Sequence, residues 1–347
     1  MTRLRIGLIG VGGIAQGRHI PSFLELQEDV ILHAVQDVNE QRAKEVAETH
    51  GIPHVYEDYP AMFQDIDAVI ICTPNKFHAE IAVAALEAGV HVLCEKPMAI
   101  TTEECERMIE AAEKNDRLLS IAYHYRFTPE AKLAKNAILE KEIGDPLVTR
   151  VQAMRRRKVP GWGVFTNKEL QGGGSLIDFG CHLLDLALWL LDDPEPVEVM
   201  GRAYDRLSKT PGQVNDWGTF DHETFNVDDH VTSYITFADG SSMQFECSWA
   251  ANIKEDHTSL SISGVDGGLS VYPLELYQAK YGALVDSTMK VNEGYPESGV
   301  AQARNFVDSC LGRTELVVQP EQALKVTKLM EAIYESSRTG SSVKINR

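Results

Sequence analysis

Three polar side chains fall on one face of an otherwise apolar stretch, residues 175–191. Asp178, His182 and Asp185 are three or four positions apart, so on a helix they are neighbours. A carboxylate one turn from an imidazole can orient it, and histidine exchanges protons near neutral pH. The pattern therefore allows an acid–base role for His182, with Asp178 orienting the imidazole. A histidine satisfied within the core, beside a capping aspartate, would produce the same pattern.

A lysine follows another apolar run, residues 90–94, in the tripeptide Glu95-Lys96-Pro97. The proline restricts the backbone beside it. An ammonium group at a strand end can donate a proton or a hydrogen bond to a reacting oxygen, and it favours a developing alkoxide. The tripeptide alone also fits a surface lysine in a turn, so the prediction depends on the elements that place Lys96.

A glycine-rich turn follows the first apolar run of the chain. Gly10 and Gly12, with Ala15 in the third small position, match G-x-G-x-x-G/A, in which backbone can approach a pyrophosphate closely. The pyrophosphate would lie at a helix N-terminus, where free N–H groups point at it. A second apolar run ends in Asp37, about 20 residues further on, where a carboxylate can hold the ribose hydroxyls of NAD. Asp37 also fits as the start of the turn before the next helix.

Strands and helices alternate up to about residue 125, which is typical of a parallel sheet covered on both faces. The expected strands begin at Arg5 and then span residues 30–37, 67–72, 90–94 and 118–122. The expected helices are residues 13–26 with a kink at Pro21, 39–50, 77–88 and 101–115. Ligands bind beyond the carboxyl ends of such strands. The polar segments there should line one crevice: residues 10–13, Asp37, 73–75 and 95–97.

The pattern changes after Arg126, where strands outnumber helices. The runs 230–237 and 242–249, joined by Asp239-Gly240, predict a hairpin in a largely antiparallel sheet. The other expected elements are helices at 129–141, 175–191, 300–311 and 320–338, strands at 146–157, 257–264, 269–272 and 342–345, and a loop at 160–174. We therefore expect two domains, residues 1–125 and 126–347, with the last helix able to pack back on the first domain.

Composition narrows the function further. The 347 residues carry a net charge of -18, which argues against nucleic acid or an anionic membrane surface as partner. Six dispersed cysteines without C-x-x-C indicate reduced thiols rather than zinc or disulfides. The chain offers neither a signal peptide nor a membrane span, so we expect a cytoplasmic protein. A metal site built from Asp178 and His182 with residues 228–230 lacks any known ligand spacing, and we expect none.

These elements together resemble the Gfo/Idh/MocA family of NAD(P)-dependent sugar and cyclitol oxidoreductases over nearly the whole chain. The resemblance rests on five segments: Gly10 to Ala15; Cys72-Thr73-Pro74-Asn75 with His78; Glu95-Lys96-Pro97; Tyr125-Arg126-Phe127 with Pro129; and Gly173-Gly174 leading to Asp178, His182 and Asp185. It implies an α/β fold with an N-terminal Rossmann domain. It also implies a C-terminal α/β domain whose large open, mostly antiparallel sheet mediates a homodimer or homotetramer.

The resemblance also implies residue roles. Lys96 would contact both nicotinamide and the reacting hydroxyl, while His182 takes the hydroxyl proton with help from Asp178. The implied cofactor residues are Gly10, Gly12, Gly13, Ile14, Asp37, Thr73, Pro74, Asn75, His78, Glu95 and Lys96. The implied substrate residues are Lys96, Arg126, Arg157, Trp162, Asp178, His182 and Asp185.

Charged residues and one loop segment indicate which cofactor and which class of substrate to expect. Asp37 would repel the 2'-phosphate of NADP, and Val38 replaces a basic residue that NADP users often carry, so we expect NAD over NADP. Residues 160–168 resemble family members that act on hexoses or glycosides, so the expected partner is a small sugar or polyol. An amino acid or keto acid would need a carboxylate clamp, for which Arg157 is available.

Two other functions remain open at this point. Some relatives hydrolyse glycosides through transient oxidation and elimination with bound NAD. The same fold also serves non-catalytic regulators that bind a dinucleotide, although such proteins need not keep Lys96 and His182.

Overall fold

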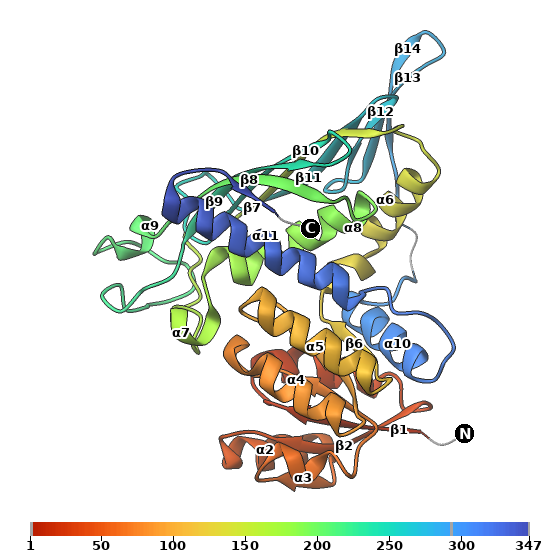
Figure 1. The fold of residues 1–347 in the computed structure, drawn as a ribbon, viewed down its shortest axis with the longest axis vertical. Coiled ribbons are helices and arrows are strands. Elements are labelled where there is room, and N and C mark those ends of the chain that lie inside the picture. Colours follow the sequence, from red (N-terminus) through yellow and green to blue (C-terminus); the bar gives the residue numbers. More distant parts are fainter. Residues whose placement is uncertain (1–2, 292–293, 346–347) are drawn as a thin grey trace. The chain divides into compact units, whose positions relative to one another are not determined.

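The computed structural model describes residues 3–291 and 294–345 and divides into two compact units. The first unit comprises Met1–Phe127 and Pro296–Leu324, and the second comprises Thr128–Tyr295 and Lys325–Arg347 (Figure 1). Residues 296–324, which the sequence-based division places in the second domain, therefore group with the first. They do so because they share its hydrophobic core, in which Phe306 and Val307 are buried together with Ile6 and Phe23.

A sheet of six parallel strands forms the centre of the first unit, where the sequence predicted a parallel sheet and located five of the six strands. The strand order β3-β2-β1-β4-β5-β6 places β1 between the two halves of the sheet, so its end is the topological switch point. Strand residues such as Leu8 and Ile70 are fully buried, as expected where helices cover both faces. The strands are β1 (Leu4–Ile9), β2 (Val30–Gln36), β3 (His54–Tyr56), β4 (Ala68–Ile71), β5 (His91–Cys94) and β6 (Leu119–Ile121).

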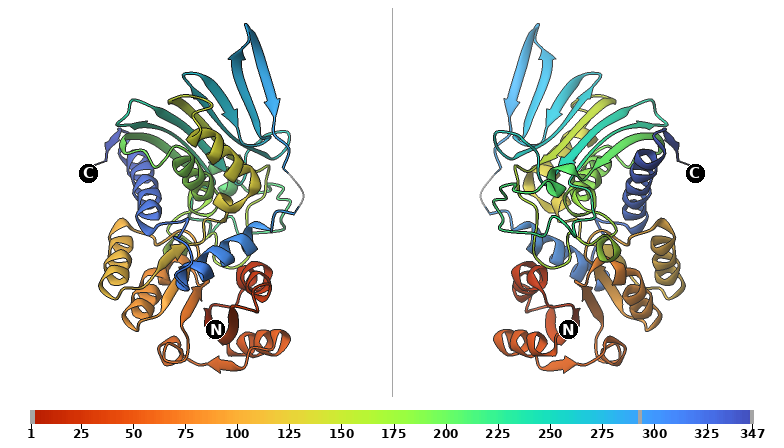
Figure 2. Two further views of the ribbon diagram at one scale, coloured as in Figure 1. Left: turned by 90° about the vertical axis from the view of Figure 1, so that its right-hand side faces the viewer. Right: turned by 90° about the vertical axis from the view of Figure 1, so that its left-hand side faces the viewer.

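Helices flank this sheet, with α4 and α5 on one side and α1 and α10 on the other (Figure 2). They are α1 (Ile20–Leu24), α2 (Glu40–His50), α3 (Tyr59–Met62), α4 (His78–Glu87), α5 (Thr102–Lys114) and α10 (Ser298–Cys310). A capping box of Thr101 and Glu104 starts α5, and Asn39 caps α2. Where a kink at Pro21 was expected, a π-helical turn, Ala15–His19, precedes α1. Pro21 lacks the N–H that a regular turn would need there.

The second unit is built on a nine-stranded sheet of order β14-β13-β12-β11-β7-β10-β9-β8-β15. Only β7 and β10 run parallel among its paired described strands, and β9 and β10 form the predicted hairpin. The strands are β7 (Pro146–Met154), β8 (Pro196–Tyr204), β9 (His230–Phe237), β10 (Ser242–Ser248), β11 (His257–Gly264), β12 (Gly267–Ser270), β13 (Glu275–Lys280), β14 (Ala283–Thr288) and β15 (Val343–Lys344).

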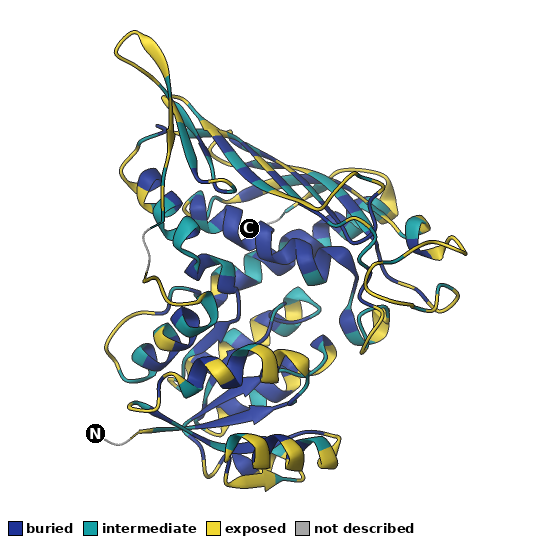
Figure 3. Cartoon of the chain, turned by 180° about the vertical axis from the view of Figure 1, so that it is seen from behind, coloured by how far each residue is buried: buried dark blue, intermediate teal, exposed yellow. Residues whose placement is uncertain are grey.

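The helices of the second unit are α6 (Pro129–Leu139), α7 (Lys168–Gln171), α8 (Cys181–Leu190), α9 (Arg206–Lys209) and α11 (Pro320–Thr339), whose first residues belong to the first unit. Helices α6, α8 and α11 lie along one face of the sheet, while α7 and α9 are short turns in the loops beside it (Figure 1). In Figure 3, buried residues follow the strands and the inner helix faces, while exposed residues follow loops and outer faces. No helix within the described ranges is both long and apolar enough to cross a bilayer.

Candidate active site

The turn after β1 has the bare backbone that a pyrophosphate requires. Gly10 has φ +80°, and a Cβ there would lie 2.7 Å from the Cys72 carbonyl oxygen, so only glycine fits. At Gly12 and Gly13 a Cβ would meet nothing within 4 Å. The chain therefore makes a tight turn at Gly10, and Gly12 and Gly13 leave open space over the backbone that follows it, as the glycine pattern predicted.

Asp37 stands at the end of β2 and holds this turn in place. Its carboxylate accepts hydrogen bonds from the backbone N–H of Val11 at 2.8 Å and of Asn39 at 2.8 Å. It also forms a two-point ion pair with Arg42, with Nη2–Oδ1 2.6 Å and Nε–Oδ2 3.1 Å. Burial opposes ionisation, but the hydrogen bonds from Arg42, Asn39 and Val11 outweigh it and hold the pKa of Asp37 below its usual value. Sequence reasoning missed Arg42.

A buried hydrogen bond between His19 and Glu95 anchors one side of Lys96. His19 Nε2 lies 2.8 Å from Glu95 Oε1, both side chains are nearly inaccessible, and the Lys96 N–H donates to Glu95 Oε2 at 3.1 Å. Burial works against the charge of Glu95, yet the hydrogen bond from His19 and nearby positive charges lower its pKa to about 2. The stability that this carboxylate contributes is thus present above its unfolded pKa, near 4.5, and is lost as the pH falls toward 2.

A second buried histidine holds the other side of the tripeptide. His78 Nδ1 lies 2.8 Å from the Pro97 carbonyl oxygen, and Nε2 lies 3.0 Å from the Thr73 carbonyl oxygen. His78 is fully buried, and burial lowers its pKa. This imidazole joins the loops after β4 and β5. The structure therefore shows His78 supporting these two loops, and the cofactor contact expected from the sequence stays a prediction.

The helix with the predicted acid and base lies in the second unit. Asp178 is in a π-helical turn, Leu176–Gly180, and His182 is in the first turn of α8. Asp178 accepts a hydrogen bond from Trp249 Nε1 at 3.1 Å and lies 3.5 Å from Arg155 Nη1. Its side chain is 18% exposed, whereas Asp185 is completely buried. Asp178 is thus held in place while part of it stays accessible.

The glycine run before this helix serves a close backbone approach. A Cβ on Gly174 would lie 1.9 Å from the Asp228 carbonyl oxygen. The Asp228 carboxylate then caps the helix, accepting from Gly174 N at 2.7 Å, Ser175 Oγ at 2.8 Å and Leu176 N at 3.0 Å. Tyr334 donates to it as well, at 2.6 Å. The Asp228 carboxylate therefore stabilises the start of the helix that carries Asp178 and His182.

The other residues considered for a metal have separate partners. Asp229 is fully buried, accepts from Ser208 N at 2.6 Å, and has its pKa raised by burial to about 6. His230 Nε2 lies 3.0 Å from Glu246 Oε1. Across the described ranges, no group of three or more His, Cys, Asp or Glu side chains is placed to hold a metal ion.

Two arginines expected at the substrate make structural contacts. Arg126 is almost fully buried in the first unit and donates to the Val317 carbonyl at 3.0 Å. Arg157 has φ +51° and donates to the Leu207 carbonyl at 3.2 Å and to Asn252 Oδ1 at 2.7 Å. Arg155 is the arginine beside Asp178. The sequence did not single out Arg155, because residues 155–158 are four consecutive cationic residues and nothing local shows which side chain points toward Asp178.

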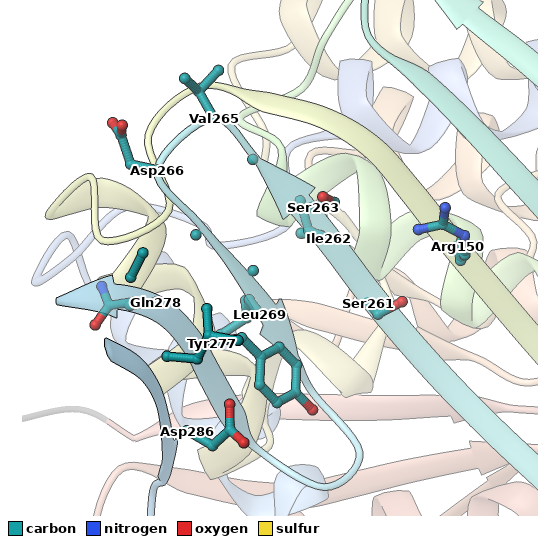
Figure 4. Close-up of a pocket in the computed structure, with 15 residues that line it drawn as sticks. Arg150, Ser261, Ile262, Ser263, Val265, Asp266, Leu269, Tyr277, Gln278 and Asp286 are labelled. Carbon is teal, nitrogen blue, oxygen red and sulfur yellow. The ribbon is translucent and has the colours of Figure 1, made fainter. Parts of the chain in front are cut away.

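A depression of about 600 Å³ lies over β11 to β14, away from these residues (Figure 4). Arg150, Tyr277 and Asp286 contribute to its lining, and none of the predicted acid, base or cofactor residues does. This depression is therefore separate from the glycine turn, from Lys96 and from the helix that carries Asp178 and His182.

The predicted residues divide between the units. Lys96, Arg126 and the residues predicted for the cofactor lie in the first unit, and Asp178, His182, Asp185, Arg157 and Trp162 lie in the second. A switch-point sheet with a glycine turn, followed by an α/β unit whose buried helix carries Asp178 and His182, is typical of a two-domain dinucleotide-binding oxidoreductase.

Comparison with known proteins agrees with this class. The model of the oxidoreductase family with an NAD-binding Rossmann fold matches residues 4–123, and that of the GFO/IDH/MocA C-terminal domain matches residues 131–270. The chain belongs to the Gfo/Idh/MocA oxidoreductase family, as the sequence resemblance predicted.

Individual relatives act on carbohydrates. D-glucoside 3-dehydrogenase of Escherichia coli (strain K12) is 34% identical over 347 residues, 99% of this chain and 97% of the relative. Levoglucosan dehydrogenase of Pseudarthrobacter phenanthrenivorans is 30% identical over 297 residues, 78% and 73% of the two chains. A solved levoglucosan dehydrogenase complex with NADH has a TM-score of 0.87 at 25% identity and covers all of both chains.

Proposed function

We propose that this enzyme transfers hydride between a secondary hydroxyl of a sugar, glycoside or cyclitol and nicotinamide. The observation that carries the proposal is the anchoring of Lys96 at the end of β5, in the sheet that holds the glycine turn. Buried histidines fix the residues on both sides of it, at 2.8 Å to Glu95 and 2.8 Å to Pro97. A lysine on an exposed turn would not need such support. The names of the relatives support a carbohydrate substrate.

The residues divide the chemistry between them. The nicotinamide, when bound, supplies the hydride acceptor. His182 takes the proton of the reacting hydroxyl in the oxidative direction, and Asp178 favours its charged form. Lys96 donates a hydrogen bond to the same oxygen and stabilises the negative charge that develops there. In the reverse direction His182 returns the proton.

We further propose NAD over NADP as the cofactor. The Asp37 carboxylate, ionised because of its hydrogen bonds to Val11, Asn39 and Arg42, would face the ribose hydroxyls and repel a 2'-phosphate. Two xylose dehydrogenase relatives are named for NADP, so cofactor use differs among the relatives of this chain.

The test is NADH absorbance with purified protein, NAD and a panel of hexoses, inositols, glucosides and amino sugars, repeated with NADP. Absorbance should rise with one group of sugars or cyclitols and rise less with NADP. No rise with any of them, although NAD binding is measured separately, would contradict the proposal. Release of the leaving group from an aryl glycoside without accumulation of NADH would favour the hydrolytic alternative.

We also propose that the enzyme is a homodimer or homotetramer that pairs through the outer face of its large sheet. Met200 on β8 and Tyr234 on β9 are paired in register there, 42% and 46% exposed. Such a partly apolar sheet face is typical of an interface between subunits. Light scattering should give a multiple of the 38.5 kDa chain mass, and Tyr234→Lys should reduce it. A monomeric wild type at micromolar concentration would contradict this.

A further inference from the structure

Two tryptophans of the second unit expose their rings side by side. Trp162 is 53% exposed and Trp217 is 37% exposed, and their ring centroids are 5.4 Å apart at an angle of 46°. Phe165 meets Trp162 edge-on at 6.2 Å. Exposed aromatic clusters are uncommon on a surface that binds nothing, because burying them is strongly favourable. The proton-transfer chemistry above uses neither tryptophan.

The two loops that carry these rings are held together. The Asn215 side chain accepts from the Val159 N–H at 2.7 Å and donates to the Val159 carbonyl at 3.0 Å. A Cβ on Gly161 would lie 2.5 Å from the Thr219 carbonyl oxygen, so glycine permits the close packing of the loops. The aromatic pair is therefore positioned before any ligand arrives, which lowers the entropic cost of binding.

Arg155 connects the aromatic pair to the acid–base helix. Its guanidinium lies 4.0 Å from the Phe179 ring centroid and 4.7 Å from that of Trp217. Its Nη1 is 3.5 Å from Asp178 Oδ2, the carboxylate that assists His182 in the proposed function. Asp178 and Trp217 therefore both lie against the guanidinium of Arg155, which places the aromatic pair near the carboxylate.

The chemistry of the pair selects a neutral, ring-shaped group. Indole faces bind the C–H faces of sugars and the faces of aromatic rings, and they offer nothing to a phosphate or carboxylate. The nearby positive charge of Arg155 is already matched by Asp178.

We propose that Trp162 and Trp217 form a second subsite that binds the aglycone or second sugar ring of a glycoside. The preferred substrate is then a glycoside or disaccharide rather than a free hexose or cyclitol. This inference rests on the proposed function for the position of the reacting ring.

The test compares the methyl and phenyl glycosides of the sugar that the wild type oxidises. The ratio of kcat/KM for phenyl over methyl glycoside should fall about tenfold in Trp162→Ala and in Trp217→Ala, the upper range for an aromatic contact. The change should appear in KM and leave kcat nearly unaltered. Trp217→Phe, which keeps an aromatic face, should recover most of the ratio. Tyr281→Ala, an exposed aromatic in the turn between β13 and β14, is the matched control and should leave the ratio unchanged.

Binding without turnover separates this inference from the proposed function. Calorimetric titration of the full chain with the phenyl glycoside of glucose should show tighter binding to the wild type than to Trp217→Ala, and Trp217→Phe should bind nearly as tightly as the wild type. Such a result with no NADH formed from any sugar would keep the subsite and overturn the oxidoreductase proposal. NADH formation with the same phenyl-to-methyl ratio in the wild type and in all tryptophan variants would overturn the subsite alone. Thermal unfolding confirms that each variant is folded.

Discussion

Replacing Lys96 with methionine, or His182 with alanine, lowers kcat by at least about a hundredfold while NAD still binds. Methionine keeps most of the length of the lysine side chain and removes the charge that favours the developing alkoxide. Alanine at 182 removes the group that takes the proton. The glycine turn and Asp37 are untouched in both variants, so the cofactor residues keep their geometry. Steady-state rates on the best substrate and NADH binding by fluorescence give the two quantities.

Lys114→Met is the matched control, because Lys114 is an exposed lysine at the end of α5 in the same unit. Its kcat should equal that of the wild type. Wild-type kcat in Lys96→Met or in His182→Ala would remove that residue from the mechanism. Loss of NADH binding in Lys96→Met would instead indicate that the lysine serves the cofactor site as a whole.

Asp37→Ser raises the preference for NADP over NAD, expressed as the ratio of kcat/KM values, by about a hundredfold, or about 2.7 kcal/mol. The substitution removes the carboxylate that would repel the 2'-phosphate. It also releases Arg42, whose guanidinium is paired with Asp37 at 2.6 Å in the wild type, and an arginine near this position can bind the 2'-phosphate. Adding Val38→Arg should extend the change, since Val38 is 98% exposed. Kinetics with both cofactors measure the ratio.

One further variant separates the loss of repulsion by the Asp37 carboxylate from attraction by the released Arg42. Arg42→Ala in the Asp37→Ser background should cancel the part due to the released guanidinium. Unchanged cofactor selectivity in Asp37→Ser would contradict the placement of Asp37 at the ribose.

Local patterns predicted most elements of the fold. The capping box at Thr101 and the left-handed stop at Gly51 depend on residues within one turn of each other, so the sequence states them directly. Apolar runs alternating with helices were enough for the parallel sheet. The strand expected at 146–157 ends at Met154. Strands β3, β8, β13 and β14 were not anticipated, since short or half-exposed strands have weak patterns.

The amino-acid sequence by itself determined which candidate groups are present: a glycine turn, a lysine at a strand end, and a carboxylate and an imidazole on one helix. It could do so because each depends on neighbours in the chain. Tertiary structure alone decided the partners: His78 with Pro97, Asp228 with the glycine run, Arg155 rather than Arg157 at Asp178, and Trp217 beside Trp162. These pairs join residues far apart in sequence. Their contacts depend on how the elements pack and on the course of the loops, and neither produces a periodic pattern in the sequence.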